Sequence, residues 1–414
     1  MRRVVQRISV PFEYPVYFTE GVFSPENEDL RAALCTLEPD RRHRFFAVID
    51  GGVAEAWPSL TSCTSRTSRT SGAGDVARYA EAHADRLCLA ADPLVIPGGE
   101  ACKNDQALVA DLWARLDALR IDRHSFVVIV GGGAALDAAG YAAATFHRGA
   151  RVVRVPTTVL AQADSGVGVK NGVNAFGKKN FLGTFAPPWA VLVDRAFLRT
   201  LPRREAVAGM AEAIKVALIR DPELFRWLEA EADALSALAP DPLARLVRSS
   251  AELHLRHIAT GGDPFELGSA RPLDFGHWSA HKMEGLTGHR LRHGEAVAIG
   301  MAMDVLYSAR ADLCSPEVAG RALALIERLG LPMWDEALDL GRGSGELHVL
   351  RGLEEFREHL GGRLTVTLLA EIGRGVEVHS MDRALIEESI EDLRSGRWRR
   401  LVPGGARAPG QAAR

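Results

Sequence analysis

Cysteine is scarce in this sequence, and the net charge is close to zero. The five cysteines, at positions 35, 63, 88, 102 and 314, are an odd number and include no CxxC pair. This pattern argues against a disulfide framework and against a zinc site made of thiolates. A formal net charge of −3 gives no overall electrostatic reason to expect a nucleic-acid partner.

Long hydrophobic runs are also missing. No apolar run is long enough to span a membrane, and the N-terminal MRRVVQRISVPFEYP lacks the continuous apolar core of a signal peptide. We therefore expect a soluble, cytoplasmic protein without a membrane partner. What is present is ordinary globular composition, with 47% hydrophobic and 25% charged residues, and a length that allows two domains.

The two halves of the chain differ in pattern. The first half alternates helical stretches with short runs that are apolar on both faces, at 44–50, 93–99, 126–133, 152–156 and 189–194. Such alternation predicts a largely parallel sheet flanked by helices. From about residue 200 the pattern becomes helical, at 204–220, 221–238 and 293–313, before a strand pair at 363–369 and 375–380 and a last helix.

These patterns predict an α/β domain at 1–187 and a mainly helical domain at 188–398. The basic stretch 399–414 is expected to be a disordered tail. The Ser/Thr/Arg/Gly tract 61–74 is expected to form a flexible surface loop.

Four histidines crowd into one segment: His277, His281, His289 and His293. On one straight helix His277 and His293 would point about 160° apart, because a helix turns about 100° per residue. The intervening Gly285-Leu286-Thr287-Gly288 favours a turn, so two segments could fold to bring these two side chains together at a metal. The alternative is a surface or core HxxxH pair with no ligand role.

Two glycine-rich segments have the features of anion sites. Gly131-Gly132-Gly133 follows a predicted strand and opens a predicted helix, where amides and the helix dipole would meet a pyrophosphate. A tight strand-to-helix turn is the alternative, because Leu136 occupies the third glycine position of GxGxxG. The segment 156–185 combines lysines, asparagines and glycines, which suits a phosphate, although a solvated loop would explain its charge.

Glu212 and Lys215 lie one helical turn apart in GMAEAIK. They could form an ordinary i,i+3 ion pair. Alternatively, Glu212 joins His277 and His293 as three protein ligands that leave open positions for substrate oxygens, as in catalytic zinc sites.

The order of motifs resembles one known family. GGGxxxD is followed by RGxRxxxVPTTxLAQxDSxVGxKxGVN, GKKNxxGxF, AExIK, RPLDFGHxxxH and HGEAVAIG. Together they resemble the 3-dehydroquinate synthase-like sugar phosphate cyclases from residue 14 to the last helix. The resemblance implies a Rossmann-like dinucleotide-binding α/β domain, a helical metal-binding domain, an active site in the cleft between them, and a homodimer.

The resemblance also assigns residues. One divalent metal, Zn or Co, would be held by Glu212, His277 and His293. NAD would contact a set in the first half of the chain: Asp50 at the ribose, Glu100 and Lys103 at the nucleotide, Gly131, Gly132 and Asp137 at the pyrophosphate, Thr157 and Thr158 near the nicotinamide, and Lys179, which is shared with the substrate. The sugar phosphate would contact Asp164, Lys170, Asn180, Lys215, Arg271, Asp274 and His281, and Arg148 would cross a dimer interface.

The implied chemistry is a cycle without net redox change. NAD⁺ oxidises a ring hydroxyl, phosphate is eliminated, the hydride returns, and the opened ring closes by an intramolecular aldol reaction. A glycerol dehydrogenase-like alcohol dehydrogenase would share the fold but would leave the KNGVN and GKKN segments unexplained. A non-catalytic scaffold would not need the Glu/His/His set.

One position bears on the substrate. Dehydroquinate synthases usually read NxGHxxxH, whereas this chain has Asp274 in DFGH and lacks the family's usual lysine about fourteen residues before Arg271; Arg256 and His257 lie nearby. Two like charges ~4 Å apart repel by roughly 4 kcal/mol at an effective dielectric constant of about 20, so Asp274 would oppose a substrate carboxylate. Asp274 together with His281 resembles the 2-epi-valiolone branch, which predicts sedoheptulose 7-phosphate as the substrate. The alternative is a divergent 3-dehydroquinate synthase acting on 3-deoxy-arabino-heptulosonate 7-phosphate.

Overall fold

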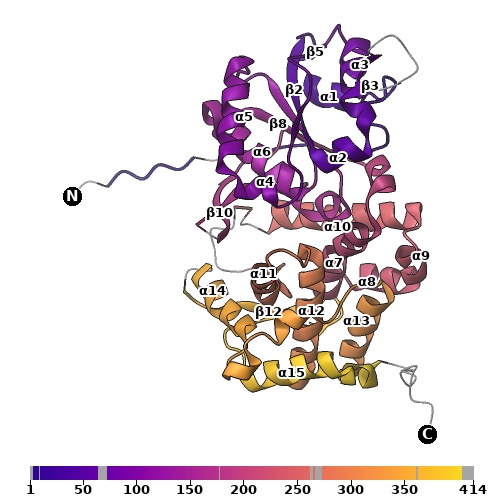
Figure 1. Cartoon of the computed structure of the whole chain (residues 1–414), viewed down its shortest axis with the longest axis vertical. Helices are drawn as coiled ribbons and strands as arrows, with labels where there is room; N and C mark the ends of the chain where they lie inside the picture. The colour runs from indigo at the N-terminus through magenta and orange to yellow at the C-terminus, as the bar shows by residue number, and fades with distance from the viewer. Residues whose placement is uncertain are drawn as a thin grey trace. The chain divides into compact units, whose positions relative to one another are not determined.

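The structure is a computed structural model that describes residues 3–8, 10–63, 72–176, 178–261, 264–265, 273–359 and 362–402. Residues 64–71 of the predicted surface loop and 403–414 of the predicted tail therefore lie outside the described residues. Two compact units divide the chain: unit 1 comprises residues 1–157 and 165–200, and unit 2 comprises 158–164 and 201–414. Figure 1 shows their helices and strands, coloured along the chain.

Unit 1 is built on a parallel sheet with the strand order β1-β11-β8-β7-β2-β5, in which β6 also pairs with β2. The strands are β1 (Val16–Thr19), β2 (His43–Asp50), β5 (Leu87–Leu89), β6 (Leu94–Ile96), β7 (Phe126–Gly131), β8 (Arg151–Pro156) and β11 (Ala190–Asp194). All of their pairings are parallel, so the predicted sheet is confirmed.

Both faces of this sheet are buried, as the apolar runs predict. Alternate residues of β2, such as Phe45 and Ile49, pack with α1 and α3 in one core cluster. The intervening Phe46 and Val48 are equally buried on the opposite face. The alanine-rich helix α6 (Gly133–Thr145) packs against β7 and β8 of this sheet. Side chains alternate across a strand, so a strand covered on both faces is apolar throughout.

The helices of unit 1 connect the strands. They are α1 (Asp29–Cys35), α2 (Gly51–Ala56), α3 (Asp75–Ala82), α4 (Ala101–Asn104), α5 (Gln106–Ala118) and α6 (Gly133–Thr145). Two short antiparallel pairs complete the unit: β3 (Ser62–Cys63) with β4 (Gly72–Ala73), and β9 (Lys170–Ala175) with β10 (Lys178–Phe185).

A buried arginine holds the segment that leads into β9. The guanidinium of Arg154, in β8, is 1% exposed and donates hydrogen bonds to the carbonyl oxygens of Gly168 and Lys170 and to Oδ1 of Asn171, each at 2.8 Å. Burial lowers the pKa of Arg154, against the opposite effect of Asp137. Because a buried cation needs such acceptors, Arg154 fixes the backbone that presents Lys170.

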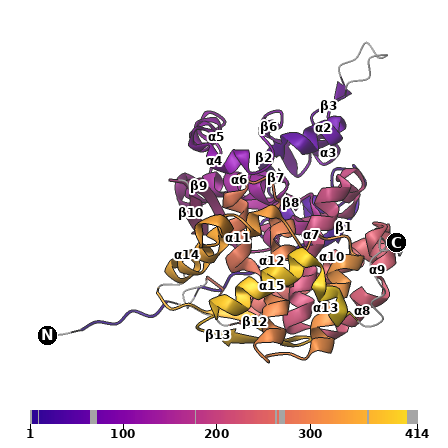
Figure 2. The same ribbon diagram turned by 60° about the horizontal axis from the view of Figure 1, so that its bottom comes forward.

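Unit 2 is mainly helical. Its elements are α7 (Arg203–Arg220), α8 (Pro222–Ala230), α9 (Ala232–Ser236), α10 (Pro240–Thr260), α11 (His277–Leu286), α12 (His293–Arg310), α13 (Pro316–Arg328), α14 (Arg351–His359), β12 (Val366–Glu371), β13 (Arg374–Val378) and α15 (Arg383–Ser395). The predicted strand pair is therefore confirmed. The almost entirely buried α12 packs against α7, α11, α13 and α15, and Figure 2 shows it beside α11 and α15.

The division between the units differs from the boundary drawn at residues 187 and 188. Ala190–Asp194 forms β11, which pairs with β1 and β8 inside the sheet, so unit 1 continues to residue 200. Residues 158–164, by contrast, belong to unit 2 and include most of a π-helical turn, Ala161–Ser165. Such turns are frequent at functional sites.

Each helix within the described ranges falls short of the combination of length and apolarity that crossing a membrane would require.

We predict that Arg154→Met lowers the free energy of unfolding by about 2–4 kcal/mol, because it leaves several buried carbonyl oxygens without a donor. Chemical denaturation would measure this change. The exposed Arg123→Met is the matched control and should change stability by less than about 0.5 kcal/mol. Equal stability of the two variants would show that Arg154 does not hold this segment.

Candidate active site

Two of the four clustered histidines begin separate helices. His277 is the first residue of α11, which ends at Leu286, and His293 is the first residue of α12. The predicted break at Gly285–Gly288 is therefore confirmed. Because the chain turns between the two helices, His277 and His293 approach each other, with ring centroids 5.4 Å apart.

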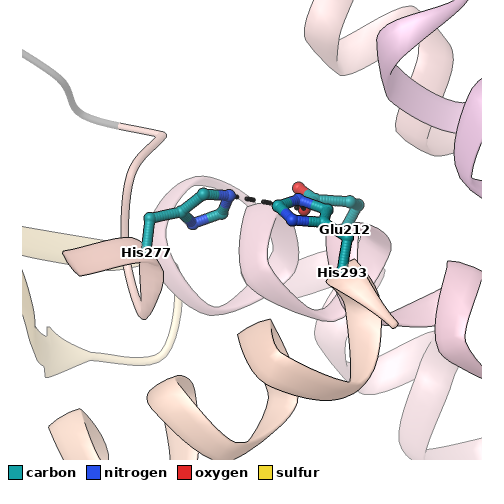
Figure 3. Close-up of side chains that lie close together, drawn as sticks. All are labelled: Glu212, His277 and His293. Atoms are coloured by element: carbon teal, nitrogen blue, oxygen red, sulfur yellow. Dashed lines mark ion pairs between the residues drawn. The ribbon is translucent and has the colours of Figure 1, made fainter. Parts of the chain in front are cut away.

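Both imidazoles point toward a carboxylate on a third helix, α7 (Figure 3). Nε2 of His277 lies 3.5 Å and Nε2 of His293 lies 3.4 Å from Oε1 of Glu212. With metal–ligand bonds of about 2.1 Å, two ligand atoms of a tetrahedral zinc site are about 3.4 Å apart. The three ligand atoms therefore have the spacing that a single small cation needs.

The buried Glu212 has the charge state of a metal ligand. Its side chain is 1% exposed, and neither carboxylate oxygen has a hydrogen bond of normal geometry among the described residues. Burial alone would raise its pKa, but the ammonium of Lys215 and the two imidazoles hold the pKa well below the usual range. Oε2 forms an ion pair with the ammonium of Lys215, and Oε1 faces the two imidazoles. An ionised, buried carboxylate of this kind fits a divalent cation.

The other ring nitrogen of each histidine also has a partner. Nδ1 of His277 lies 3.0 Å from the carbonyl oxygen of Phe275, and Nδ1 of His293 lies 3.1 Å from Oε2 of the buried Glu284. A proton on each Nδ1 leaves the Nε2 lone pair directed at Glu212. Such partners fix the orientation of metal-binding histidines.

Close packing of α12 on α7 brings His293 to Glu212. A Cβ atom on Gly294 would lie 1.9 Å from the carbonyl oxygen of Ala208, one turn before Glu212, so this position requires glycine. Arg204, in the first turn of α7, forms a two-pronged ion pair with Glu295 of α12, with N–O distances of 2.6 and 2.7 Å. The start of α12 is therefore fixed against α7.

Charged side chains surround this cluster in unit 2. Burial alone would lower the pKa of the Lys215 ammonium, but nearby carboxylates raise it, and they belong to Glu212, Asp164 and Asp274. Asp164, on the π-helical turn, pairs at 2.8 Å with Nδ1 of His254 in α10. Burial would raise the pKa of Asp164, but the attraction of His254 gives a net lowering.

His254 was missed in the sequence. Arg256 and His257 lie near the position of the family's usual lysine in the sequence, whereas the structure places His254 beside Asp164. Its signal was weak, because a single histidine on an amphipathic helix has no characteristic spacing.

Two further residues of this unit, His281 and Arg271, were predicted to contact the substrate. His281 is exposed, and its ring centroid lies 5.4 Å from that of His277 and 6.0 Å from that of His293, so it borders the cluster. Arg271 lies outside the described residues.

The candidate nucleotide site of unit 1 lies at the carboxyl ends of β2 and β7. The chain leaves β2 toward β5 and β6 on one side and returns to β7 on the other, and ligands of open α/β sheets bind where the order reverses in this way. Gly131 ends β7 and Gly132 caps α6, which confirms that these glycines follow a strand and open a helix. Asp50 ends β2, where its carboxylate accepts the amide N–H of Gly52 at 2.8 Å and caps α2.

A hydrogen-bond network connects several predicted residues of unit 1. Nζ of the buried Lys103 donates to Asp137 at 2.7 Å and also to Oδ1 of Asn180. Asn174 joins this group to Glu100: its amide donates to Oε1 of Glu100 at 2.9 Å and its Oδ1 accepts the backbone N–H of Asn180 at 2.8 Å. Asn174 therefore holds Asn180, which has a left-handed φ of 53°.

Sequence reasoning did not single out Asn174. It is one of several asparagines in the same segment, and nothing in their spacing distinguishes the one that holds Asn180.

The other residues predicted to bind NAD or substrate in this part of the chain include two threonines and two lysines. The backbone N–H of Thr157 donates to Gly131 at 3.0 Å, whereas Thr158 accepts from Ala161 at 3.1 Å within unit 2. Lys170 is exposed and Lys179 half-buried. Arg148 is exposed and has a left-handed φ of 65°.

Comparison with known proteins gives two consecutive family matches. Residues 93–208 match the family described as 3-dehydroquinate synthase N-terminal, and residues 209–344 match the one described as 3-dehydroquinate synthase C-terminal. A 3-dehydroquinate synthase of Rhodospirillum rubrum is 37% identical over 377 residues, which is 90% of each chain. A 2-epi-valiolone synthase of Actinosynnema mirum is 37% identical over 280 residues, 67% of this chain and 72% of that one.

A solved structure agrees with these matches. The 2-epi-5-epi-valiolone synthase of Streptomyces hygroscopicus subsp. jinggangensis 5008, determined with NAD⁺ and Zn²⁺ bound, superposes with a TM-score of 0.78 at 27% identity, covering 94% of this chain and all of that one. Fold, sequence and the order of the motifs therefore lead to one conclusion: the chain belongs to the 3-dehydroquinate synthase-like sugar phosphate cyclases, a family of enzymes.

Proposed function

We propose that this enzyme is an NAD- and divalent-metal-dependent cyclase that converts sedoheptulose 7-phosphate to a valiolone-type C7 cyclitol. The observation that carries the choice of substrate is the position of Asp274, a carboxylate whose charge acts on Lys215 beside the Glu212–His277–His293 cluster. Relatives of the chain include both 3-dehydroquinate synthases and a 2-epi-valiolone synthase, so the choice rests on the residues.

The residues fit a metal. Glu212, His277 and His293 would hold Zn²⁺ or Co²⁺, and the buried carboxylate of Glu212 favours a cation at this place. The ion would act as a Lewis acid that makes a substrate hydroxyl more acidic. The hydrogen bonds from Nδ1 of His277 and His293 would fix the tautomer and the orientation of the two imidazoles.

The residues of unit 1 also fit a dinucleotide. The turn at Gly131 and Gly132 leaves the first amides of α6 available at the carboxyl end of the sheet, which suits a pyrophosphate. NAD⁺ would supply the reversible hydride transfer. The network of Glu100, Lys103 and Asp137 would hold the nucleotide, and Asp50, Thr157 and Lys179 complete the NAD contacts proposed in this unit. Thr158, which belongs to unit 2, is proposed on the resemblance alone.

Charge at the cluster favours a substrate without a carboxylate. With Glu212 engaged by the divalent ion, the carboxylates of Asp164 and Asp274 remain near the ammonium of Lys215. Asp164 also pairs with the imidazole of His254 at 2.8 Å. A further carboxylate on the substrate would meet repulsion, whereas ionised carboxylates accept hydrogen bonds from hydroxyls.

The remaining residues would orient the sugar phosphate. Lys170, Asn180 and His281 are the proposed phosphate contacts, because an ammonium, an amide and an imidazole can each donate a hydrogen bond to an anion. Lys215 and Asp164 would orient hydroxyls and hold the proton that moves during oxidation. Arg271, and Arg148 from a second subunit of a homodimer, complete the proposed set.

Metal binding is tested with His277→Ala. We expect this variant to lose most of its bound zinc and its turnover, because two protein ligands rarely hold zinc tightly. Metal analysis of the purified, folded protein measures the loss. His124→Ala, which removes a histidine that is 55% exposed, is the control and should keep full zinc content. Stoichiometric zinc in folded His277→Ala would show that the assignment is wrong.

The role of NAD is tested by counting turnovers. If the hydride returns to the substrate in every cycle, a catalytic amount of NAD⁺ should support many turnovers with no steady rise in NADH absorbance. Product should therefore exceed the NAD⁺ supplied. Production of one NADH per alcohol oxidised would instead identify an alcohol dehydrogenase.

The substrate is tested with purified enzyme, NAD⁺, and equal concentrations of sedoheptulose 7-phosphate and 3-deoxy-arabino-heptulosonate 7-phosphate, with products identified by NMR. We expect kcat/KM to favour sedoheptulose 7-phosphate by about a hundredfold or more, given repulsion of roughly 4 kcal/mol. Asp274→Asn should reduce this preference, whereas Asp233→Asn, at a side chain that is 92% exposed, should not. A preference for the keto acid with dehydroquinate as product would make the enzyme a 3-dehydroquinate synthase.

A further inference from the structure

A buried acid on α12 lies behind the candidate metal site without being part of it. The side chain of Asp304 is fully buried, and each carboxylate oxygen accepts one hydrogen bond. Oδ2 accepts the backbone N–H of Gly276 at 3.1 Å, and Oδ1 accepts the indole N–H of Trp278 at 3.0 Å. Gly276 and Trp278 are the two neighbours of His277 in the chain, so one carboxylate holds both sides of this histidine.

The turn before His277 leaves little freedom for another arrangement. Gly276 has a left-handed φ of +77°, and a Cβ atom there would lie 2.7 Å from the backbone nitrogen of Met301 in α12. A Cβ atom on Gly300, one turn before Asp304, would lie 2.1 Å from the carbonyl oxygen of Gly276. The first turn of α11 is therefore pressed against α12, where Asp304 meets it.

Burying a carboxyl group at this position is energetically costly unless both of its oxygens accept hydrogen bonds. Burial raises the pKa of Asp304 to about 7, although the hydrogen bonds from Trp278 and Gly276 oppose this rise. A buried donor without an acceptor would be costly, so the carboxylate satisfies the Gly276 N–H and the Trp278 indole N–H together.

We propose that Asp304 is a positioning residue that sets the direction of the His277 imidazole, and with it the affinity of the site for its metal. By holding the backbone of Gly276 and the side chain of Trp278, it fixes the start of α11. Nε2 of His277 then faces Glu212 and His293, whose helix, α12, also carries Asp304. The proposal rests on the proposed function in one respect: Glu212, His277 and His293 must bind the metal.

Asp304→Asn tests this role with little change of shape. An amide keeps one acceptor but turns an NH₂ group toward either the Gly276 N–H or the Trp278 indole N–H, so one of these bonds is lost. We expect zinc affinity, measured on the apo-enzyme by competition with a chelator, to fall by about 10–100-fold, as it does when partners of metal ligands are changed. The electronic spectrum of the Co²⁺-loaded protein should also change, because the ligand geometry changes.

Ser308→Ala is the matched control. Ser308 lies one turn further along α12, is fully buried, donates to the carbonyl oxygen of Asp304 at 2.6 Å and accepts the N–H of Leu369 at 3.1 Å. Its loss removes buried hydrogen bonds but leaves those to Gly276 and Trp278. Zinc affinity and the Co²⁺ spectrum should therefore remain those of the unaltered enzyme. Trp278→Phe removes only the hydrogen bond from the indole N–H, so its zinc affinity should lie between those of Asp304→Asn and the unaltered enzyme. It replaces Asp304→Asn as the test variant if Asp304→Asn does not fold.

Two results would overturn the proposal. One is that Asp304→Asn has the same zinc affinity and Co²⁺ spectrum as the unaltered enzyme. If Asp304→Asn does not fold, the same result in Trp278→Phe would overturn the proposal. The other is an equal loss of affinity in Ser308→Ala, which would show a general effect of packing. A different result, failure of the unaltered enzyme to bind zinc, would reject the proposed metal site itself.

Discussion

Burying the carboxylate of Glu212 requires positive charge or strong hydrogen-bond donors around it, and the arrangement of α7, α11 and α12 meets this requirement. Lys215 lies one turn away on the same helix. The imidazoles of His277 and His293 reach the carboxylate from the first residues of two other helices. Because an unpaired buried charge is strongly destabilising, these helices and their side chains depend on one another.

Other contacts in unit 2 hold α7 and α12 together and orient His293. Gly294 lets α12 approach α7, the Arg204–Glu295 ion pair fixes their first turns, and Glu284 holds the far nitrogen of His293. Unit 1 follows a different principle. Its candidate nucleotide site depends on a parallel sheet whose strand order reverses at β2 and β7. It also depends on a lysine–carboxylate–amide network that joins α4, α6 and the β9–β10 pair. A cyclase that oxidises, eliminates and reduces needs both kinds of site.

Much of this could be predicted from the sequence. The apolar runs predicted the parallel strands. The predicted break at Gly285–Gly288 explains why His277 and His293 begin separate helices. The residues that the sequence did not reveal are those defined by contacts across long separations. His254, Asn174 and Asp304 have no characteristic spacing, and each acquires its role from a partner on another element. The boundary at residues 187 and 188 assigned β11 to the second domain and did not anticipate its pairing with β1 and β8. In the sequence, the last strand of one domain looks the same as the first strand of the next.

The central claim is that one metal ion joins α7, α11 and α12. The most direct measurement is an anomalous difference map from crystals of the zinc-loaded enzyme. We predict a single strong peak within about 2.0–2.2 Å of Nε2 of His277, Nε2 of His293 and a carboxylate oxygen of Glu212. The neighbouring His281, Glu284 and His293 also bring their ligand atoms close together. A peak held by those three residues instead, or no peak near Glu212, would contradict the account.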